Sequence, residues 1–337
     1  MTITAAVTDR MSFSFYLGTS DIAAIRRCAN IADAITLQGR SGPRVAIALR
    51  RAGWDGPVLF DLAGYERHSP HVDPDGWCEE QSAAGADRIL TPGRWIPWSG
   101  AVNSLRAPLE QEIELAAERG ATALIAMDYR WLTRGIDPTS TLFEAANVPI
   151  AIALSHRDDP LSAGQAVDGL ITLCKKSDHL SLFRSDHGAI GALAFGAAHA
   201  ALGLRTATRH LYPPDASGGG GWNGDRSQRL FVSRLLDWYT AFKIAGWGAS
   251  EIEMVCPLAC CEGAPLGRFL DERLADQAQI HNETALAELA TYVINAPRND
   301  RRRLFAQRCR DAIDLYDRLG SMAIHPKAQL EAWAVWA

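Results

Sequence analysis

The sequence predicts a (β/α)8 barrel followed by a smaller, helical C-terminal subdomain that binds zinc. Three observations indicate this fold. Short apolar segments alternate with helix-like segments through residues 12–214, which is typical of parallel α/β barrels. Polar residues repeatedly follow the apolar segments, where the active sites of such barrels lie. Three cysteines and a histidine then occur close together in residues 256–281.

Eight segments are expected to form the strands of the barrel, and several are continuously apolar, as buried parallel strands are. The predicted strands are 13–18, 34–38, 57–65, 88–92, 123–128, 149–156, 179–187 and 205–212. Helices are expected between them, and glycines such as Gly53 and Gly120 mark two of the helix ends. The predicted helices are 21–30, 43–51, 77–84, 105–119 and 188–204.

The predicted domain boundary lies in a glycine-rich segment, so that the barrel spans 12–214 and the zinc-binding subdomain spans 227–337. Residues 218–221 are consecutive glycines. Ordering such a run costs much conformational entropy, which favours a flexible linker or lid. The sequence fits a phosphate-binding loop less well, because no lysine follows the glycines. Further helices are expected at 227–245, 266–296 and 298–320.

The composition indicates a large apolar core without an overall positive charge. The chain has 337 residues, of which 47% are hydrophobic, a net charge of -5 and a pI near 6.0. A long-range positive field that would attract nucleic acid is therefore excluded, and any such contact needs a local basic face. The densest basic run is 298–303, which we expect to be the solvated start of a helix.

The cysteine content and the absence of targeting patterns indicate a cytoplasmic protein. The chain has 7 cysteines, an odd number, and most are scattered, which argues against a disulfide framework. Residues 1–10 lack a signal-peptide pattern, and no apolar run reaches membrane-spanning length. We therefore expect no membrane association. The sequence leaves the oligomeric state open, a homodimer included.

The cysteine cluster predicts a structural zinc site. Cys256, Cys260 and Cys261 lie within six residues, and His281 follows. Zinc favours four tetrahedral ligands, and thiolates with one imidazole suit it. A catalytic zinc would keep an open position for water. The alternative is that the cysteines are small buried hydrophobic residues, since their spacing is not that of a standard zinc finger or ribbon.

Acidic and basic residues at the predicted strand ends are the candidate catalytic groups. Asp61, Asp128, Asp186 and His210 fall at or near carboxyl ends of strands, where the chemistry of (β/α)8 enzymes takes place. The structural alternative is that each aspartate caps the helix that follows it.

The cysteine cluster resembles the zinc motif of the tRNA-guanine transglycosylase superfamily, which also contains enzymes that act on DNA. The family motif is Cys-x-Cys-x-x-Cys followed by a His-Asn pair. Cys256 and Cys261 match its first and third cysteines, and His281-Asn282 matches the distal pair. Leu258 stands at the second cysteine position, and Cys260 lies two residues further along.

Three further segments are similar to motifs of this family. Residues 61–66, Asp-Leu-Ala-Gly-Tyr-Glu, look like the family's Asp-Ser-Gly-Gly-Phe-Gln. Residues 126–128 end on an aspartate, like the family strand whose aspartate binds the base. Residues 188–196 are similar to its Gly-Gly-Leu-Ala-Val-Gly turn. The family's Pro-Thr-Arg segment after the nucleophile, and its glutamine on the Gly-Ile-Val-Gln-Gly strand, have no counterpart here.

The resemblance implies an enzyme that exchanges a guanine-type base for a 7-deazaguanine in tRNA, DNA or a nucleotide. Such exchange passes through an oxocarbenium-like transition state, so carboxylates can both attack and stabilise it. The implied roles are acid/base catalysis for Asp61, base recognition for Asp128 and nucleophilic attack for Asp186. Gly64 and Tyr65 belong to the matched motif and are expected to contact the substrate.

Four further polar residues are candidates for holding a phosphate or sugar: Arg184, His187, Arg209 and His210. Arg209 and His210 have an alternative role in pairing with loop carbonyls. Two rival functions stay open as well. One is a non-catalytic barrel that binds a partner. The other is an unrelated (β/α)8 hydrolase or lyase that uses the same strand-end carboxylates without zinc.

Overall fold

The computed structural model describes residues 11–66, 72–100, 102–214, 225, 227–248, 254–319 and 324–336. The chain divides into two compact units, Met1–Ala216 and Ser217–Ala337. The glycine run 218–221 lies outside the described residues. Among the described helices, none combines the length and apolar character that a membrane span requires.

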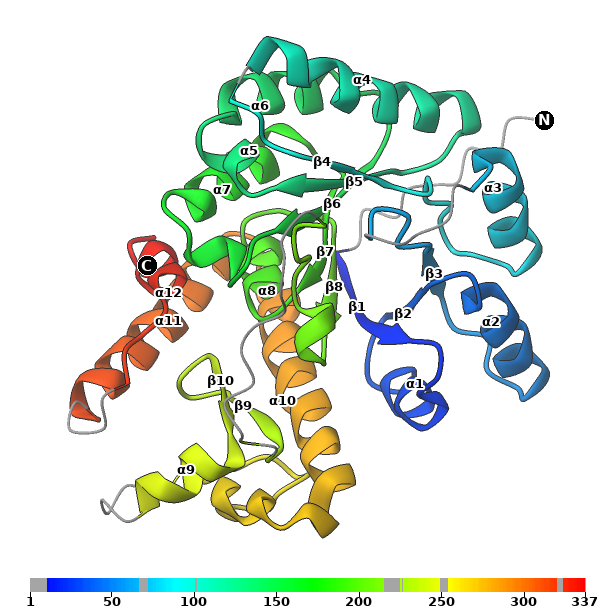
Figure 1. Cartoon of the computed structure of the whole chain (residues 1–337). Helices are drawn as coiled ribbons and strands as arrows, with labels where there is room; N and C mark the ends of the chain where they lie inside the picture. Colours follow the sequence, from blue (N-terminus) through cyan, green and yellow to red (C-terminus); the bar gives the residue numbers. More distant parts are fainter. Residues whose placement is uncertain are drawn as a thin grey trace. The chain divides into compact units, whose positions relative to one another are not determined.

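The first unit contains a curled sheet of eight parallel strands, which confirms the predicted barrel-type fold (Figure 1). The strand order is β3-β2-β1-β8-β7-β6-β5-β4. The strands are β1 (Ser12–Gly18), β2 (Ala34–Gln38), β3 (Val58–Asp61), β4 (Arg94–Ile96), β5 (Ala123–Asp128), β6 (Ile150–Ser155), β7 (Leu180–Ser185) and β8 (His199–Gly203). Since all strands are parallel, their carboxyl ends lie at one edge of the sheet.

Helices connect successive strands of this sheet. They are α1 (Ile22–Cys28), α2 (Gly42–Arg51), α3 (Pro74–Ala83), α4 (Val102–Arg119), α5 (Arg130–Thr133), α6 (Ile136–Ala145), α7 (Ala166–Lys176) and α8 (Gly188–Ala194). Two begin at aspartates that cap them. Asp21 accepts a hydrogen bond from the backbone N–H of Ala24, and Asp73 accepts from that of Gly76, which satisfies N–H groups that lack partners within a helix.

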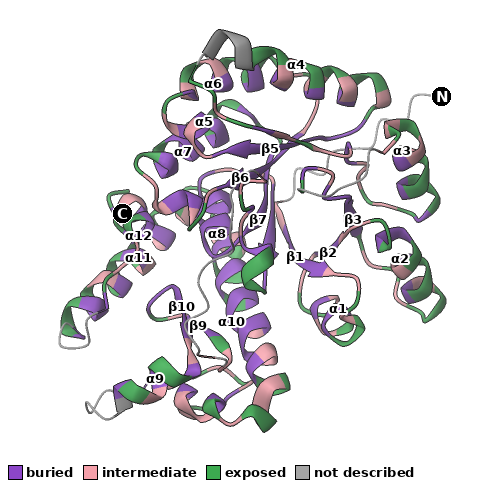
Figure 2. Ribbon diagram, viewed as in Figure 1, coloured by how far each residue is buried: buried purple, intermediate pink, exposed green. Residues whose placement is uncertain are grey.

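Side chains alternate between the inside of the curled sheet and its helix-covered face, and both faces are buried (Figure 2). The inner cluster includes Tyr16, Leu59, Leu124, Ala153 and Phe183. The period of two places the last inward residues of β3 and β5 at the carboxyl edge. The curled sheet is therefore filled by side chains, and Asp61 and Asp128 lie where their strands end.

Three predicted elements of the barrel were wrong. The strand predicted at 88–92 is irregular; Leu90 forms only an isolated bridge with Thr122, and β4 follows at 94–96. The helix predicted at 188–204 ends at Ala194, because the small-residue segment after it forms β8. The strand predicted at 205–212 is instead a 3-10 turn with one bridge from Leu211 to Ser155.

Tertiary pairing explains the error at β8. Its alanine-rich sequence suits a helix locally, but the segment lies between β1 and β7 and is completely buried. Strand preference depends strongly on such packing. After β8 the chain turns back so sharply that a Cβ at Gly203 would lie 2.1 Å from the carbonyl oxygen of Thr208. Only a glycine fits this turn.

The second unit combines a β-hairpin with helices. Its elements are β9 (Arg229–Val232), β10 (Asp237–Thr240), α9 (Ala241–Gly248), α10 (Ala275–Asn295), α11 (Arg301–Arg318) and α12 (Ala328–Ala334). The helix predicted at 227–245 was wrong over most of its length, since residues 229–240 form the antiparallel β9–β10 hairpin and α9 begins only at Ala241. Leu236, in the connecting turn, has a positive φ of 50°, which a continuous helix does not contain.

Gly169 offers a direct test of helix packing in the first unit. It lies on α7, where a Cβ would stand 1.9 Å from the carbonyl oxygen of Leu132 on α5. We expect Gly169→Ala to lower the free energy of unfolding by about 1–3 kcal/mol, because the overlap outweighs the gain in helix propensity. Urea denaturation of the full chain measures this. Gly18→Ala is the control, because no atom lies within 4 Å of its added Cβ; equal effects would contradict the packing argument.

Candidate active site and metal centre

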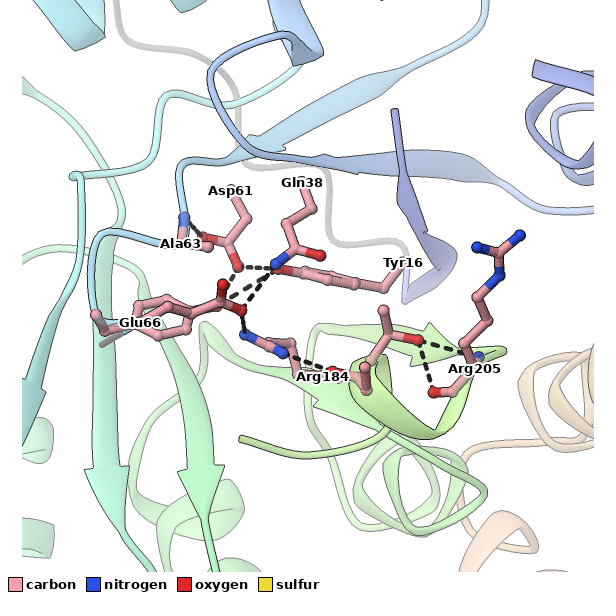
Figure 3. A network of polar contacts seen from close by, with 10 residues as sticks. Tyr16, Gln38, Asp61, Ala63, Glu66, Arg184 and Arg205 are labelled. Atoms are coloured by element: carbon pink, nitrogen blue, oxygen red, sulfur yellow. Dashed lines mark hydrogen bonds and ion pairs between the residues drawn. The ribbon is translucent and has the colours of Figure 1, made fainter. Parts of the chain in front are cut away.

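Asp61, the last residue of β3, is the centre of a buried polar network (Figure 3). Its Oδ2 accepts hydrogen bonds from the hydroxyl groups of Tyr16, at 2.7 Å, and of Tyr65. Its Oδ1 accepts from the backbone N–H of Ala63 at 2.7 Å. Ala63 itself has a left-handed φ of 57°, so the loop turns directly after this contact. Three donors therefore fix the Asp61 side chain.

Burial favours the protonated form of the Asp61 carboxyl group. It raises the pKa of Asp61 more than the three donors and the nearby Arg184 lower it. Burial and the adjacent Asp61 also raise the pKa of Tyr16 and of Tyr65 well above the usual range. A carboxyl group with a raised pKa, bonded to two phenols, is suited to store and transfer a proton.

Arg184 enters this network through an irregularity in β7. Its backbone has a left-handed φ of 51° at a register shift between β7 and β8, and such bulges redirect side chains. The guanidinium carbon lies 5.5 Å from the ring centre of Tyr16 and 5.6 Å from that of Tyr65. The Arg184 side chain is only 4% exposed. The bulge thus places a buried cation against both phenol rings.

The polar partners of Arg184 come from loops at the carboxyl ends of the strands. Its Nη1 lies 2.5 Å from Oε1 of Glu66, and its Nη2 donates to the carbonyl oxygen of Ala207 at 2.6 Å. Gln38, the last residue of β2, donates to the same Glu66 oxygen at 2.8 Å. Residues of β1, β2, the loop after β3, and β7 therefore meet in one network.

Two predicted substrate-binding residues lie in the loop after β3. Tyr65 belongs to the network. Gly64 approaches the backbone before β4 so closely that a Cβ would lie 2.9 Å from the carbonyl oxygen of Pro92. A glycine is therefore required at position 64 by packing, whatever its role in binding.

Asp128 lies at the end of β5 and pairs with its own loop. Its Oδ1 accepts from the backbone N–H of Arg130 at 2.9 Å and from its Nε at 2.8 Å, and its Oδ2 accepts from Nη2 at 2.7 Å. Among the described residues, no hydrogen bond or ion pair joins Asp128 to the Asp61 network. A ligand that binds the Asp128 carboxylate must either displace Arg130 or share that carboxylate with it.

Asp186 and its neighbour occupy the start of α8. Oδ1 of Asp186 accepts from the backbone N–H of Gly188 at 3.1 Å, although His187, not Asp186, is the N-cap residue of α8. Nδ1 of the fully buried His187 lies 3.5 Å from the same oxygen. The catalytic role of Asp186 stays a prediction.

The two remaining candidates follow β8. Arg209 donates from Nη2 to the carbonyl oxygen of Leu204 at 3.0 Å, the loop contact that was the alternative to substrate binding. The ring of His210 packs against that of Tyr212, with centres 4.8 Å apart. Both residues therefore help to shape the segment that follows the last strand.

Sequence reasoning did not single out Tyr16, Gln38 or Glu66. Tyr16 lies in an apolar strand and looks like a core residue, although the inward register of β1 points it at the carboxyl edge. Gln38 ends its strand just as Asp61 does, and Glu66 ends the matched 61–66 motif. Five of the eight strands end on a polar residue, whether charged or not, and this recurrence was the signal that could have found Gln38.

In the second unit, Cys256, Cys260, Cys261 and His281 form one cluster whose ligand atoms all lie within 4.8 Å of one another. Sγ of Cys260 lies 3.8 Å from Sγ of Cys261, which lies 3.5 Å from Nδ1 of His281. Zinc bonds of about 2.3 Å to sulfur and 2.0 Å to nitrogen place tetrahedral ligands roughly 3.5–3.8 Å apart. The cluster can therefore hold a metal ion.

A tight turn brings the three cysteines together. The backbone N–H of Gly263 donates to the carbonyl oxygen of Cys256 at 2.9 Å, and Cys256 donates to that of Ala264 at 3.2 Å. Glu262 and Gly263 have positive φ angles of 52° and 82°. The backbone N–H of Leu258 donates to Sγ of Cys256, so the residue at the family's second cysteine position supports the first ligand.

His281 and Asn282 tie this cluster to the hairpin. Nε2 of His281 lies 3.0 Å from the carbonyl oxygen of Phe231 on β9, while Nδ1 faces the thiols. Burial lowers the pKa of His281, which keeps the neutral, metal-binding form. Asn282 accepts from the N–H of Phe231 at 2.8 Å and donates to the carbonyl oxygen of Arg229 at 2.9 Å. Such second contacts orient metal ligands.

No protein-family model and no curated protein matches this chain. Solved structures with similar folds include 3-hexulose-6-phosphate synthase from Salmonella typhimurium, with a TM-score of 0.37 and 18% identity over 60% of this chain and 93% of that one. A mutant tryptophan synthase alpha-subunit from Pyrococcus furiosus has a TM-score of 0.37 and 12% identity over 57% and 86%. An HpcH/HpaI aldolase from Desulfitobacterium hafniense has a TM-score of 0.36 and 13% identity over 58% of this chain and 87% of that one. At these values the likeness carries no inference about the reaction.

Metal analysis tests the cysteine–histidine cluster. We expect the purified chain to retain about one zinc ion after dialysis, and His281→Ala to lose it, because three thiolates alone leave the tetrahedron incomplete. Elemental analysis of both proteins measures the metal content. His179→Ala, at an exposed histidine, is the control and should keep the ion. A wild-type protein without metal, or a His281→Ala variant with undiminished metal, would refute the assignment.

Proposed function

We propose that the chain is a transglycosylase-like enzyme that exchanges a guanine-type base for a 7-deazaguanine in nucleic acid or a nucleotide. The observation that carries the proposal is the buried Asp61 carboxyl group, held by two phenols where the barrel strands end. The proposal draws further support from the Cys3His cluster with its His281-Asn282 pair, which accompanies such a barrel in the family that the sequence resembles.

Asp61 is suited to the proton transfers of this reaction. When the glycosidic bond breaks, its electron pair stays on the ring nitrogen of the departing base, which then takes a proton. The incoming base loses its ring N–H as the new bond forms. A carboxyl group whose pKa burial raises can give the first proton and accept the second. Asp61 has no exposed surface, so these protons would pass through the hydroxyl group of Tyr65 or Tyr16, both of which are buried as well.

The remaining roles follow the family resemblance. Asp186 is the proposed nucleophile at the sugar carbon, and its Oδ1 also accepts from the backbone N–H of Gly188. Asp128 is the proposed base-recognition residue and would share its carboxylate with Arg130. His187, Arg209 and His210 are the proposed contacts to sugar or phosphate, either directly or by shaping the loops at the strand ends.

The proposed metal is zinc, in a structural role. Three thiolates and one imidazole complete a tetrahedron, so no position stays open for a reacting water. A bound zinc would cross-link the turn of residues 256–264 to α10. Through His281 and Phe231 it would also stabilise β9. We therefore assign no catalytic step to the metal.

A second candidate is an unrelated barrel lyase or hydrolase that uses the same proton-transfer group. One observation favours it. The Asp61 network brings together two tyrosines and an arginine, and the candidate base-recognition residue Asp128 is paired with Arg130. Such an enzyme would use Asp61 and the phenols for acid/base catalysis without a glycosyl intermediate.

Incorporation of labelled guanine distinguishes these candidates. We expect wild-type protein to transfer the label into at least one acceptor among tRNA, duplex DNA and guanine nucleotides, measured by mass spectrometry of the released nucleosides. Asp61→Asn should slow exchange about 10²–10⁴-fold, since it removes the acid/base group.

Asp178→Asn, at an exposed carboxylate away from the network, is the matched control and should exchange at the wild-type rate. Absence of label from every acceptor would rule out base exchange. A fully active Asp61→Asn variant would show that Asp61 only shapes the fold.

A further inference from the structure

Glu66 is the exposed end of the Asp61 network. Its side chain is 42% exposed, whereas Arg184 is 4% exposed and Asp61 is fully buried. Of these three ionisable side chains, only Glu66 is therefore accessible to an approaching ligand. It follows Gly64 and Tyr65 in the loop after β3, beside the residue to which we assign acid/base catalysis.

Two side chains orient the Glu66 carboxylate, and both donate to the same oxygen. Oε1 lies 2.5 Å from Nη1 of Arg184 and accepts from Nε2 of Gln38 at 2.8 Å (Figure 3). Among the described residues, no hydrogen bond reaches Oε2. The carboxylate is thus fixed through one oxygen while the other keeps its acceptor capacity.

The fixing cation cannot easily move away. The backbone of Arg184 is in a left-handed conformation. Its side chain packs against the rings of Tyr16 and Tyr65 and donates to the carbonyl oxygen of Ala207. A buried guanidinium that lost its carboxylate partner would be strongly destabilised. Glu66 therefore holds one orientation before any ligand arrives, and preorganisation of this kind increases affinity and selectivity.

The charges of the network favour a hydrogen-bond donor as its ligand. Asp61 and Glu66 are carboxyl groups, and among the described residues Arg184 is the one cation beside them. Once Asp61 gives up its proton, the three groups carry one net negative charge. An amino group or ring N–H placed at Oε2 would offset that charge, whereas a phosphate or carboxylate there would be repelled.

We infer that Glu66 determines base specificity by accepting, at Oε2, a hydrogen bond from an exocyclic amino group of the base. The inference rests on the proposed function and adds to it a recognition residue, with Gln38 and Arg184 as its positioning residues. A site built to accept such a bond discriminates against bases that lack the donor, because binding them leaves a carboxylate oxygen desolvated and without a partner.

Equilibrium binding of free bases tests this assignment without requiring exchange. We expect wild-type protein to bind guanine at least about tenfold more tightly than hypoxanthine, which lacks the amino group, as one lost hydrogen bond to a charged group implies. Glu66→Gln should reduce that ratio to within about threefold of unity, chiefly by weakening guanine binding. Isothermal titration calorimetry measures both affinities.

Glu144→Gln is the matched control, because Glu144 is also a partly exposed carboxylate in an ion pair, with Lys176. It should keep the wild-type ratio. Gln38→Leu is a second variant; it keeps the charge of Glu66 but removes one orienting donor, so it should lower the ratio less than Glu66→Gln does. Circular dichroism spectra establish that each variant is folded.

The outcomes separate this inference from the proposed function. A Glu66→Gln variant that keeps the guanine preference overturns the role of Glu66, even if wild-type protein exchanges bases. A wild-type protein that binds both bases equally overturns it as well. Loss of the preference in Glu66→Gln supports it, also where no acceptor is labelled and base exchange itself is refuted.

Discussion

The burial of the Arg184 guanidinium is the constraint on which the carboxyl edge of the barrel depends. A buried cation is stable only with a carboxylate, hydrogen-bond acceptors and favourable ring contacts around it. Glu66 supplies the first, Ala207 the second, and the two tyrosine rings the third. The same tyrosines donate to Asp61, so the position of the acid/base group follows from how the cation is held.

The C-terminal unit uses a polar cluster for a different purpose. Three thiols and His281 join a tight turn to α10, and the neighbouring Asn282 bonds the N–H of Phe231 and the carbonyl oxygen of Arg229 on β9. A short hairpin has little core of its own, so these contacts stabilise it. The first unit thus concentrates its polar side chains where chemistry is proposed, and the second where the chain needs cross-links.

Much of the fold could be predicted from the sequence, because apolar segments such as 34–38 and 123–128 match β2 and β5. The four metal-ligand candidates also come together as expected. The alanine-rich β8 and the β9–β10 hairpin were not predictable, since tertiary pairing overrides local preference there. Arg184 was predicted only as a phosphate or sugar contact. Its neighbours in the structure depend on a left-handed backbone conformation, which an arginine in the sequence does not indicate.

The central claim is that Asp61 carries an exchangeable proton. The infrared difference spectrum between wild-type protein and Asp61→Asn, recorded across a pH series, isolates the C=O band of the protonated Asp61 carboxyl group. Because burial raises the pKa of Asp61, this band should persist above the ordinary aspartate pKa of about 3.9. A band that disappears at or below that pH would mean that Asp61 is an ionised acceptor for the two phenols, and would contradict the proposed acid/base role.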